Sequence, residues 1–107
     1  MSLDISFRKT TEVEVFESNI THNLGKMATE LGVYALIWRH EESGVESAAC
    51  LLGPVAAAID ELRTRPEHYD QFDAANGWGT RVHMMKFLQE IQSAAREHPD
   101  ATVHSRR

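Results

Sequence analysis

Polar side chains that could do chemistry gather where an alternating apolar stretch gives way to a helical pattern. Asn19, His22 and Asn23 lie at this junction. Backbone N–H groups at a helix start can hold a carboxylate or a phosphate, and a histidine can transfer a proton near neutral pH. The same residue types also cap helices by bonding to orphan backbone groups. We weigh a ligand site against a capping role here, and the residue types favour capping.

A second group of unusual residues precedes a later helical pattern. Asn76, Gly77 and Trp78 belong to the stretch Asp-Ala-Ala-Asn-Gly-Trp-Gly over 73–79. Glycines let a ligand approach the backbone, and an indole offers a stacking face. The alternative is a structural turn whose Trp78 fills the core. This Gly-x-Gly follows a short helical segment rather than a strand, so it does not match a phosphate-binding fingerprint, and the turn is favoured.

We predict that the two junctions come together in the fold and form one cleft. Tyr69 and Trp38 would be its neighbouring aromatic walls. If the site is catalytic, His22 is the expected general base, with Asn23 or Asn76 orienting the substrate. The candidate ligand-binding residues are therefore Asn19, His22, Asn23, Tyr69, Asn76, Gly77 and Trp78.

Metal and nucleophile chemistry have little support in the sequence. The six histidines include no pair at i, i+4 and no His-Glu-x-x-His motif, so we expect neither a metal site nor a cofactor. Folding could still gather His22, His68, Asp73 and His83. The single cysteine, Cys50, lies in the apolar run 48–52, which predicts a buried and unreactive thiol.

Length and composition describe one folded domain over residues 1–107. Hydrophobic residues make up 42% of the chain and charged residues 25%, which is enough for a single core. Eleven Lys and Arg against sixteen Asp and Glu give a net charge of −5, so nucleic acid is not an expected partner. There is no apolar run of about 18 residues and no basic start typical of export signals. We therefore expect a cytoplasmic protein without a membrane partner.

Alternating hydrophobicity predicts strands at both ends of the chain. Strands over 4–8 and 12–17 would form a hairpin in which Val13 and Val15 face the same side as Ile5 and Phe7. Residues 1–3 are not part of the predicted strands. A weaker alternation over 101–106 predicts a third strand.

Apolar residues at helical spacing predict the elements between these strands. A helix over 24–31 would be capped by Thr21 and ended by Gly32, and a short helix over 34–39 would follow. A capping box at Ser43 and Glu46 would begin the longest helix, with a kink or restart at Pro54. Pro66 would begin a short helix over 67–72, and Thr80 would cap the last one.

These elements predict an α+β fold with a small antiparallel sheet of about three strands. The N-terminal hairpin and the C-terminal strand would form this sheet, and three to four helices would cover it. The two chain ends would meet in the sheet. An all-helical fold survives only if both terminal segments are disordered.

Four stretches together resemble a family of small bacterial and phage proteins with no established activity. They are Asn19–Ala28, Leu36–Arg39, Pro66–Tyr69 and Asn76–Gly79, and the similarity spans the chain from about Phe16 to Ser105. Ala75 stands where that family often has a proline before its Asn-Gly pair. The resemblance supports the fold and implies no particular chemistry.

The sequence favours a non-enzymatic binding protein of bacterial or phage origin. Its partner would be another protein or a second copy of the chain. The alternative is a small-ligand-binding protein or a small enzyme that uses the cleft of His22, Asn23, Asn76 and Trp78.

Overall fold

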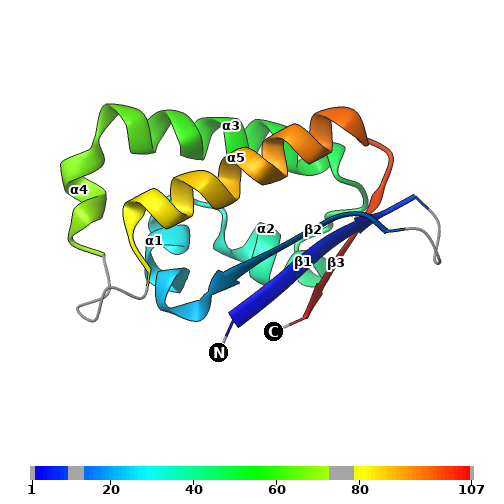
Figure 1. Ribbon diagram of the computed structural model, residues 1–107, viewed down its shortest axis with the longest axis horizontal. Coiled ribbons are helices and arrows are strands. Elements are labelled where there is room, and N and C mark those ends of the chain that lie inside the picture. Colours follow the sequence, from blue (N-terminus) through cyan, green and yellow to red (C-terminus); the bar gives the residue numbers. More distant parts are fainter. Residues whose placement is uncertain (1, 10–13, 73–78, 107) are drawn as a thin grey trace.

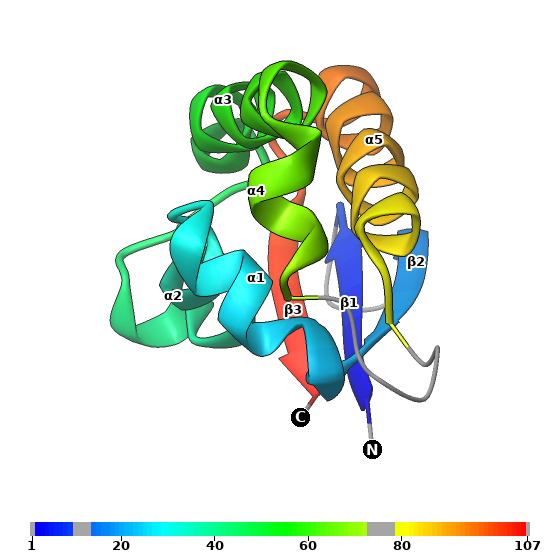
Figure 2. The same cartoon turned by 90° about the vertical axis from the view of Figure 1, so that its left-hand side faces the viewer.

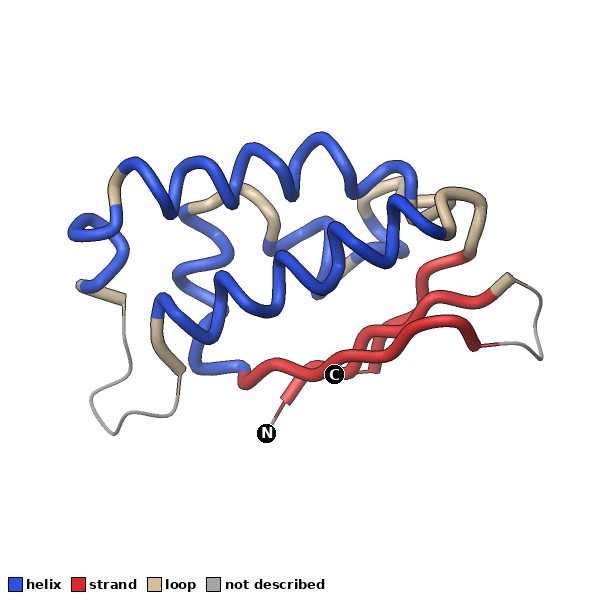
Figure 3. Tube along the Cα trace, turned by 45° about the horizontal axis from the view of Figure 1, so that its top comes forward, coloured by secondary structure: helices blue, strands red, loops and turns tan. Residues whose placement is uncertain are grey.

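A three-stranded antiparallel sheet lies beneath a layer of helices (Figures 1 and 3). The computed structural model describes residues 2–9, 14–72 and 79–106. The elements of this part are β1 (Ser2–Arg8), β2 (Glu14–Thr21), a 3-10 turn η1 (His22–Leu24), α1 (Gly25–Glu30), α2 (Tyr34–Trp38), a 3-10 turn η2 (His40–Glu42), α3 (Ala49–Thr64), α4 (Pro66–Asp70), α5 (Arg81–Glu97) and β3 (Thr102–Arg106). The predicted α+β class with a small antiparallel sheet is confirmed.

The strand order β2-β1-β3 brings the two ends of the chain side by side, as predicted (Figure 2). β1 is the central strand, and both of its neighbours run antiparallel to it. On the inner face Phe7 lies opposite Phe16 on one side and Val103 on the other. The strand begins earlier than expected, at Ser2, and Leu3 is fully buried. The first residues of the chain therefore contribute to the core.

A β-bulge interrupts the alternation of β2. The predicted inward side of Val15 is confirmed, because Val15 is partly buried against the core, and Val13 lies outside the described residues. Phe7 pairs with Phe16 but Arg8 pairs with Glu14, so Val15 is the extra residue. One extra residue exchanges the two faces of a strand. After the bulge, the inward positions are even-numbered and end at the buried Ile20. β2 also runs on to Thr21, past the predicted end at 17.

The helices cover one face of this sheet. α5 lies across β2, and α3 packs against α5 (Figures 1 and 2). Both helices turn an apolar stripe inward, as their spacing predicts. The core between these elements includes Leu3, Ile5 and Phe7 of β1, Leu51, Val55, Ile59 and Leu62 of α3, and Met84, Phe87, Leu88 and Ile91 of α5.

Two predicted helix ends are confirmed. Gly32 has φ +80°, and its N–H donates to the Thr29 carbonyl while the Val33 N–H donates to the Ala28 carbonyl. This is the Schellman arrangement that ends a helix on a left-handed glycine. Thr80 caps α5, since its hydroxyl oxygen accepts from the His83 N–H.

The predicted start of α3 is wrong. Ser43 does not cap this helix, because its hydroxyl donates to the Ala35 and Arg39 carbonyls. α3 begins at Ala49, and the N–H groups of Ala48 and Ala49 donate to carbonyls of the segment before β3, at 2.8 and 2.9 Å. Distant backbone thus satisfies the donors for which a capping side chain was expected. The helix also continues through Pro54 without a restart.

Candidate functional site

The two predicted junctions approach each other at Gly79. This glycine is buried with φ +124°, and a Cβ atom on it would lie 3.0 Å from Thr21 Cγ2 and 3.1 Å from Leu24 Cγ. The backbone that enters α5 is therefore held against the turn that enters α1. Asn76, Gly77 and Trp78 lie outside the described residues, so their grouping with His22 stays a prediction.

His22 serves as a hydrogen-bond acceptor for a core tryptophan. The Trp38 indole Nε1–H donates to His22 Nδ1 at 2.9 Å, and Trp38 itself is almost completely buried. The Tyr34 ring stacks on the same indole. Because Nδ1 accepts, the neutral ring carries its proton on Nε2. The lone pair that a general base would need is already engaged.

The other described candidates do not gather around His22. Asn19 lies on the outer face of the sheet, where its amide donates to Ser2 Oγ and Asp4 Oδ1 and ties β2 to β1. Asn23 is exposed, and its backbone N–H donates to the Thr21 hydroxyl oxygen. The contact between Asn23 and Thr21 is a helix cap, as predicted, whereas the Asn19 amide bonds side chains of β1 instead of backbone groups at a helix start.

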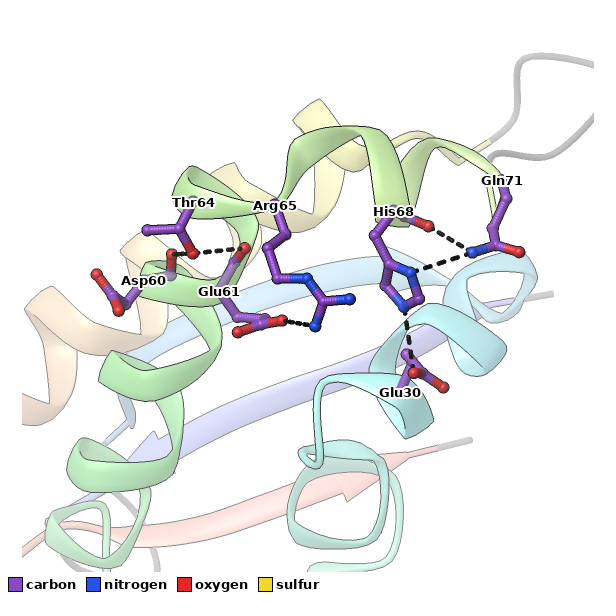
Figure 4. A network of polar contacts seen from close by, with 7 residues as sticks. All are labelled: Glu30, Asp60, Glu61, Thr64, Arg65, His68 and Gln71. Carbon is purple, nitrogen blue, oxygen red and sulfur yellow. Dashed lines mark hydrogen bonds and ion pairs between the residues drawn. The ribbon is translucent and has the colours of Figure 1, made fainter.

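Tyr69 is buried in the helical layer instead of lining an open cleft. Burial raises the pKa of its phenol, and a hydrogen bond to the Glu61 carboxylate raises this pKa further. Glu61 of α3 also pairs with Arg65 at 2.8 Å (Figure 4). The phenol of Tyr69 therefore adjoins an ion pair.

A polar network connects α4 to α1 next to this tyrosine (Figure 4). His68 Nε2 lies 3.2 Å from Glu30 Oε1, and the Gln71 amide donates to the His68 carbonyl. His83 is engaged elsewhere, because its Nδ1 accepts from the Thr80 N–H in the cap of α5. Across 2–9, 14–72 and 79–106, no three His, Cys, Asp or Glu side chains converge on a metal-binding arrangement.

Cys50 contradicts its prediction, because its side chain is exposed. Cys50 is the second residue of α3. Successive residues of the run 48–52 point in different directions around the helix axis, and of these five residues only Ala48 and Leu51 are buried. The backbone N–H groups of Ser47 and Glu46 lower the pKa of the thiol by stabilising the thiolate, and the Ser47 hydroxyl adds to this effect.

The outer edge of β2 offers an unpaired strand edge beside a groove. β2 is an edge strand, and in the part of the chain that the structure describes its backbone pairs only with β1. α5 lies above β2 on the side away from β3 (Figure 2). Between them is an open groove of about 390 Å³, lined by Val15, Phe16, Lys86, Gln89, Glu90, Ser93, Ala94 and Glu97.

Carboxylates border this edge on the outer face of the sheet. The bulge at Val15 places Glu14 and Glu17 next to each other on that face. A hydrogen bond with Glu14 and its negative charge raise the pKa of Glu17, and burial and Asp4 add to this effect. The sequence reasoning missed this surface because the edge position follows from the strand order. The signal it could have used is the polar stripe at three- and four-residue spacing over 86–97.

Comparison of the chain with protein-family models, with curated proteins and with solved structures finds no match. The resemblance to small bacterial and phage proteins therefore stays a prediction from the four sequence stretches. Within the described ranges, none of the helices combines the length and the apolar composition needed to cross a bilayer.

Proposed function

We propose that this protein is a non-enzymatic interaction domain that binds an extended segment of a partner protein along the outer edge of β2. One observation carries this proposal: the unpaired edge of β2 lies beside the groove against α5. An edge strand presents a row of backbone donors and acceptors, and an added strand can pair with them.

The groove gives such pairing a means of selecting side chains. Alternate residues of an added strand point to opposite faces of the sheet. Those on the inner side would enter the groove, where Phe16 and Ala94 offer apolar surface. Backbone pairing would provide affinity, and the groove would provide specificity.

The alternative of a small-ligand site or enzyme has weaker support. The contact of Gly79 with Thr21 and Leu24 agrees with the predicted cleft. However, the Trp38 indole engages the lone pair that His22 would need as a general base, and Tyr69 is buried. A cytoplasmic location and a bacterial or phage origin stay predictions from the sequence.

Selection of binding peptides followed by NMR mapping tests this proposal. Peptides from a random library displayed on phage would be selected on the folded chain, and one synthetic binder would be titrated into labelled protein. We expect amide shifts over Glu14–Thr21 and along the groove side of α5. Failure to obtain a binder, or shifts confined to other elements, would overturn the proposal.

A matched pair of variants separates groove binding from general effects of charge. Ser93 is exposed and lines the groove, whereas Ala57 is exposed on α3 and does not. Ser93→Arg should fill the groove and weaken peptide binding by about tenfold or more, equivalent to about 1.4 kcal/mol. Ala57→Arg should leave the affinity unchanged.

A further inference from the structure

We propose that the segment bound at β2 is basic, with lysine or arginine at alternate positions and apolar residues between them. This inference rests on the proposed function and specifies the class of partner. Two faces of the same edge carry the argument, the outer face of the sheet and the groove against α5.

The outer face of the sheet near β2 is acidic. Glu14 and Glu17 are both exposed and adjacent, and Asp4 of β1 lies diagonally across from Glu17. Arg8 of β1 lies opposite Glu14, so three carboxylates of β1 and β2 here face one guanidinium of these strands. A hydrogen bond with Glu14 raises the pKa of Glu17, and the negative charges of Glu14 and Asp4 raise it further. A cation placed between these carboxylates would relieve their repulsion. Outward residues of an added strand would lie next to this pair. Opposite charges in neighbouring strands stabilise a sheet, so lysine or arginine suits these positions.

Long basic side chains also have space on this face. A hollow of about 320 Å³ extends across the outer face from Glu14 and Glu17 to His104, and Arg8 and Arg106 also line it. Ser6 lies between Glu17 and His104 in the strand register. Because its side chain is small, little side-chain volume fills the centre of this face. The flexible stem of a lysine can lie over such a surface while its ammonium group reaches a carboxylate.

The inner side of the edge favours apolar residues. Phe16 and Ala94 give the groove its apolar floor, while Lys86, Glu90 and Glu97 are the charged residues that line it. Two carboxylates against one ammonium keep this lining negative as well. An apolar side chain between two basic ones therefore fits the alternation of the site.

A second copy of the chain is a poor occupant of the same edge. Antiparallel pairing of β2 with another β2 would bring the Glu14 and Glu17 pairs of both copies onto one face. Like charges directly opposite each other destabilise a strand pair. The charges that would attract a basic segment thus oppose self-pairing.

Three synthetic peptides of about eight residues test the inference, each capped at both ends. One alternates valine with lysine, one alternates valine with glutamate, and one alternates valine with glutamine. Affinity would be measured by titration at low salt, with the amide shifts of β2 as the site-specific readout. We expect the lysine peptide to bind at β2 at least tenfold more tightly than either of the others.

Neutral variants supply the matched control. Glu14→Gln together with Glu17→Gln keeps the shape of the site and removes its charge. Exposed surface ion pairs each contribute only a few-fold to affinity, so loss of two of them should make the double variant bind the lysine peptide about 2- to 30-fold more weakly. Asp60→Asn together with Glu67→Gln removes two exposed carboxylates near α4, at the other end of the molecule, and should change nothing (Figure 1).

The outcomes separate the two proposals. If phage-selected peptides shift β2 but are not basic, or if the Gln variants bind the lysine peptide normally, this inference is wrong and edge binding stands. If no peptide, selected or designed, shifts β2, both proposals fail. Concentration-dependent dimerisation through β2 in sedimentation would point to a second copy and would also overturn the inference.

Discussion

The hydrogen bond between Trp38 and His22 determines what is expected of a histidine substitution. His22→Ala leaves the indole N–H in the core without its acceptor, which costs about 1–3 kcal/mol. For a domain of this size, such a loss lowers the melting temperature by on the order of 5–15 °C. Thermal unfolding followed by circular dichroism measures this change.

A conservative variant serves as the control for this substitution. His22→Gln retains a side-chain acceptor and should recover part of the lost stability. An unchanged melting temperature in His22→Ala would contradict a stabilising role of the hydrogen bond between Trp38 and His22.

Cys50 should react readily in the folded protein. The backbone N–H groups of Ser47 and Glu46 lower its thiol pKa, so more thiolate is present at a given pH than for an ordinary cysteine. The rate of alkylation by iodoacetamide should therefore rise with pH around a lower midpoint than that of an ordinary cysteine. Because the folded state releases this proton more readily, thiol ionisation favours folding as the pH rises.

The reaction of Cys50 has a clear control in the unfolded chain. Denatured protein should show the ordinary midpoint, since the N–H donors are no longer held at the sulfur. A thiol that reacts only after denaturation would contradict its exposed position.

Residue types alone indicated that the polar side chains at the first junction form hydrogen bonds, but they did not indicate with which partners. His22 and Asn19 stand out in the sequence, yet the indole and the carboxylate that bond them come from segments distant along the chain. Cys50 was misplaced because a run of apolar letters was treated as one buried surface. On a helix, successive residues of such a run point in different directions.

At the scale of the elements, two glycines should respond differently to alanine. Gly79 has φ +124° and no room for a Cβ atom beside Thr21 and Leu24, so Gly79→Ala should cost on the order of 1–3 kcal/mol. Gly53 lies inside α3, and apart from its two chain neighbours no atom lies within 4 Å of its Cβ position. Gly53→Ala gains helix propensity but places a Cβ atom against the ring of Pro54, so its net effect on the free energy of unfolding should be small.

Chemical denaturation of both variants measures these free energies of unfolding. The Gly53 variant controls for the general effect of replacing glycine by alanine. A Gly79 variant as stable as the original chain would show that the two junctions are not held in contact.

Most elements follow from periodicity, but their details depend on contacts that a single segment does not contain. Gly32 and Thr80 mark their helix ends by local chemistry, and both predictions are confirmed. The bulge at Val15 exists only in the pairing of β1 with β2. The start of α3 depends in the same way on carbonyls near Ala101, so local sequence could not reveal it.

At the scale of the whole molecule, removal of β3 should affect both layers. Deletion of residues 100–107 exposes the edge of β1 that pairs with β3. The deletion removes the Ala101 carbonyl, which accepts a hydrogen bond from the Ala48 N–H before α3. It also removes the bond between Ser105 and His40. We expect loss of cooperative unfolding and aggregation through the opened edge, measured by thermal denaturation and size-exclusion chromatography.

A substitution series provides the control for this deletion. Thr102→Ala and Arg106→Ala change exposed side chains of β3 while keeping its backbone pairing, and both should leave unfolding cooperative. A deleted chain that stays monomeric and unfolds cooperatively would contradict the structural role of β3.

The strand order also bears on how the chain is synthesised. β1 leaves the ribosome before β3, which covers one of its edges and is translated about a hundred residues later. A nascent chain can form the hairpin and the helices early, but it cannot finish its sheet until then. Throughout that interval the central strand has one side available to chaperones or to neighbouring nascent chains.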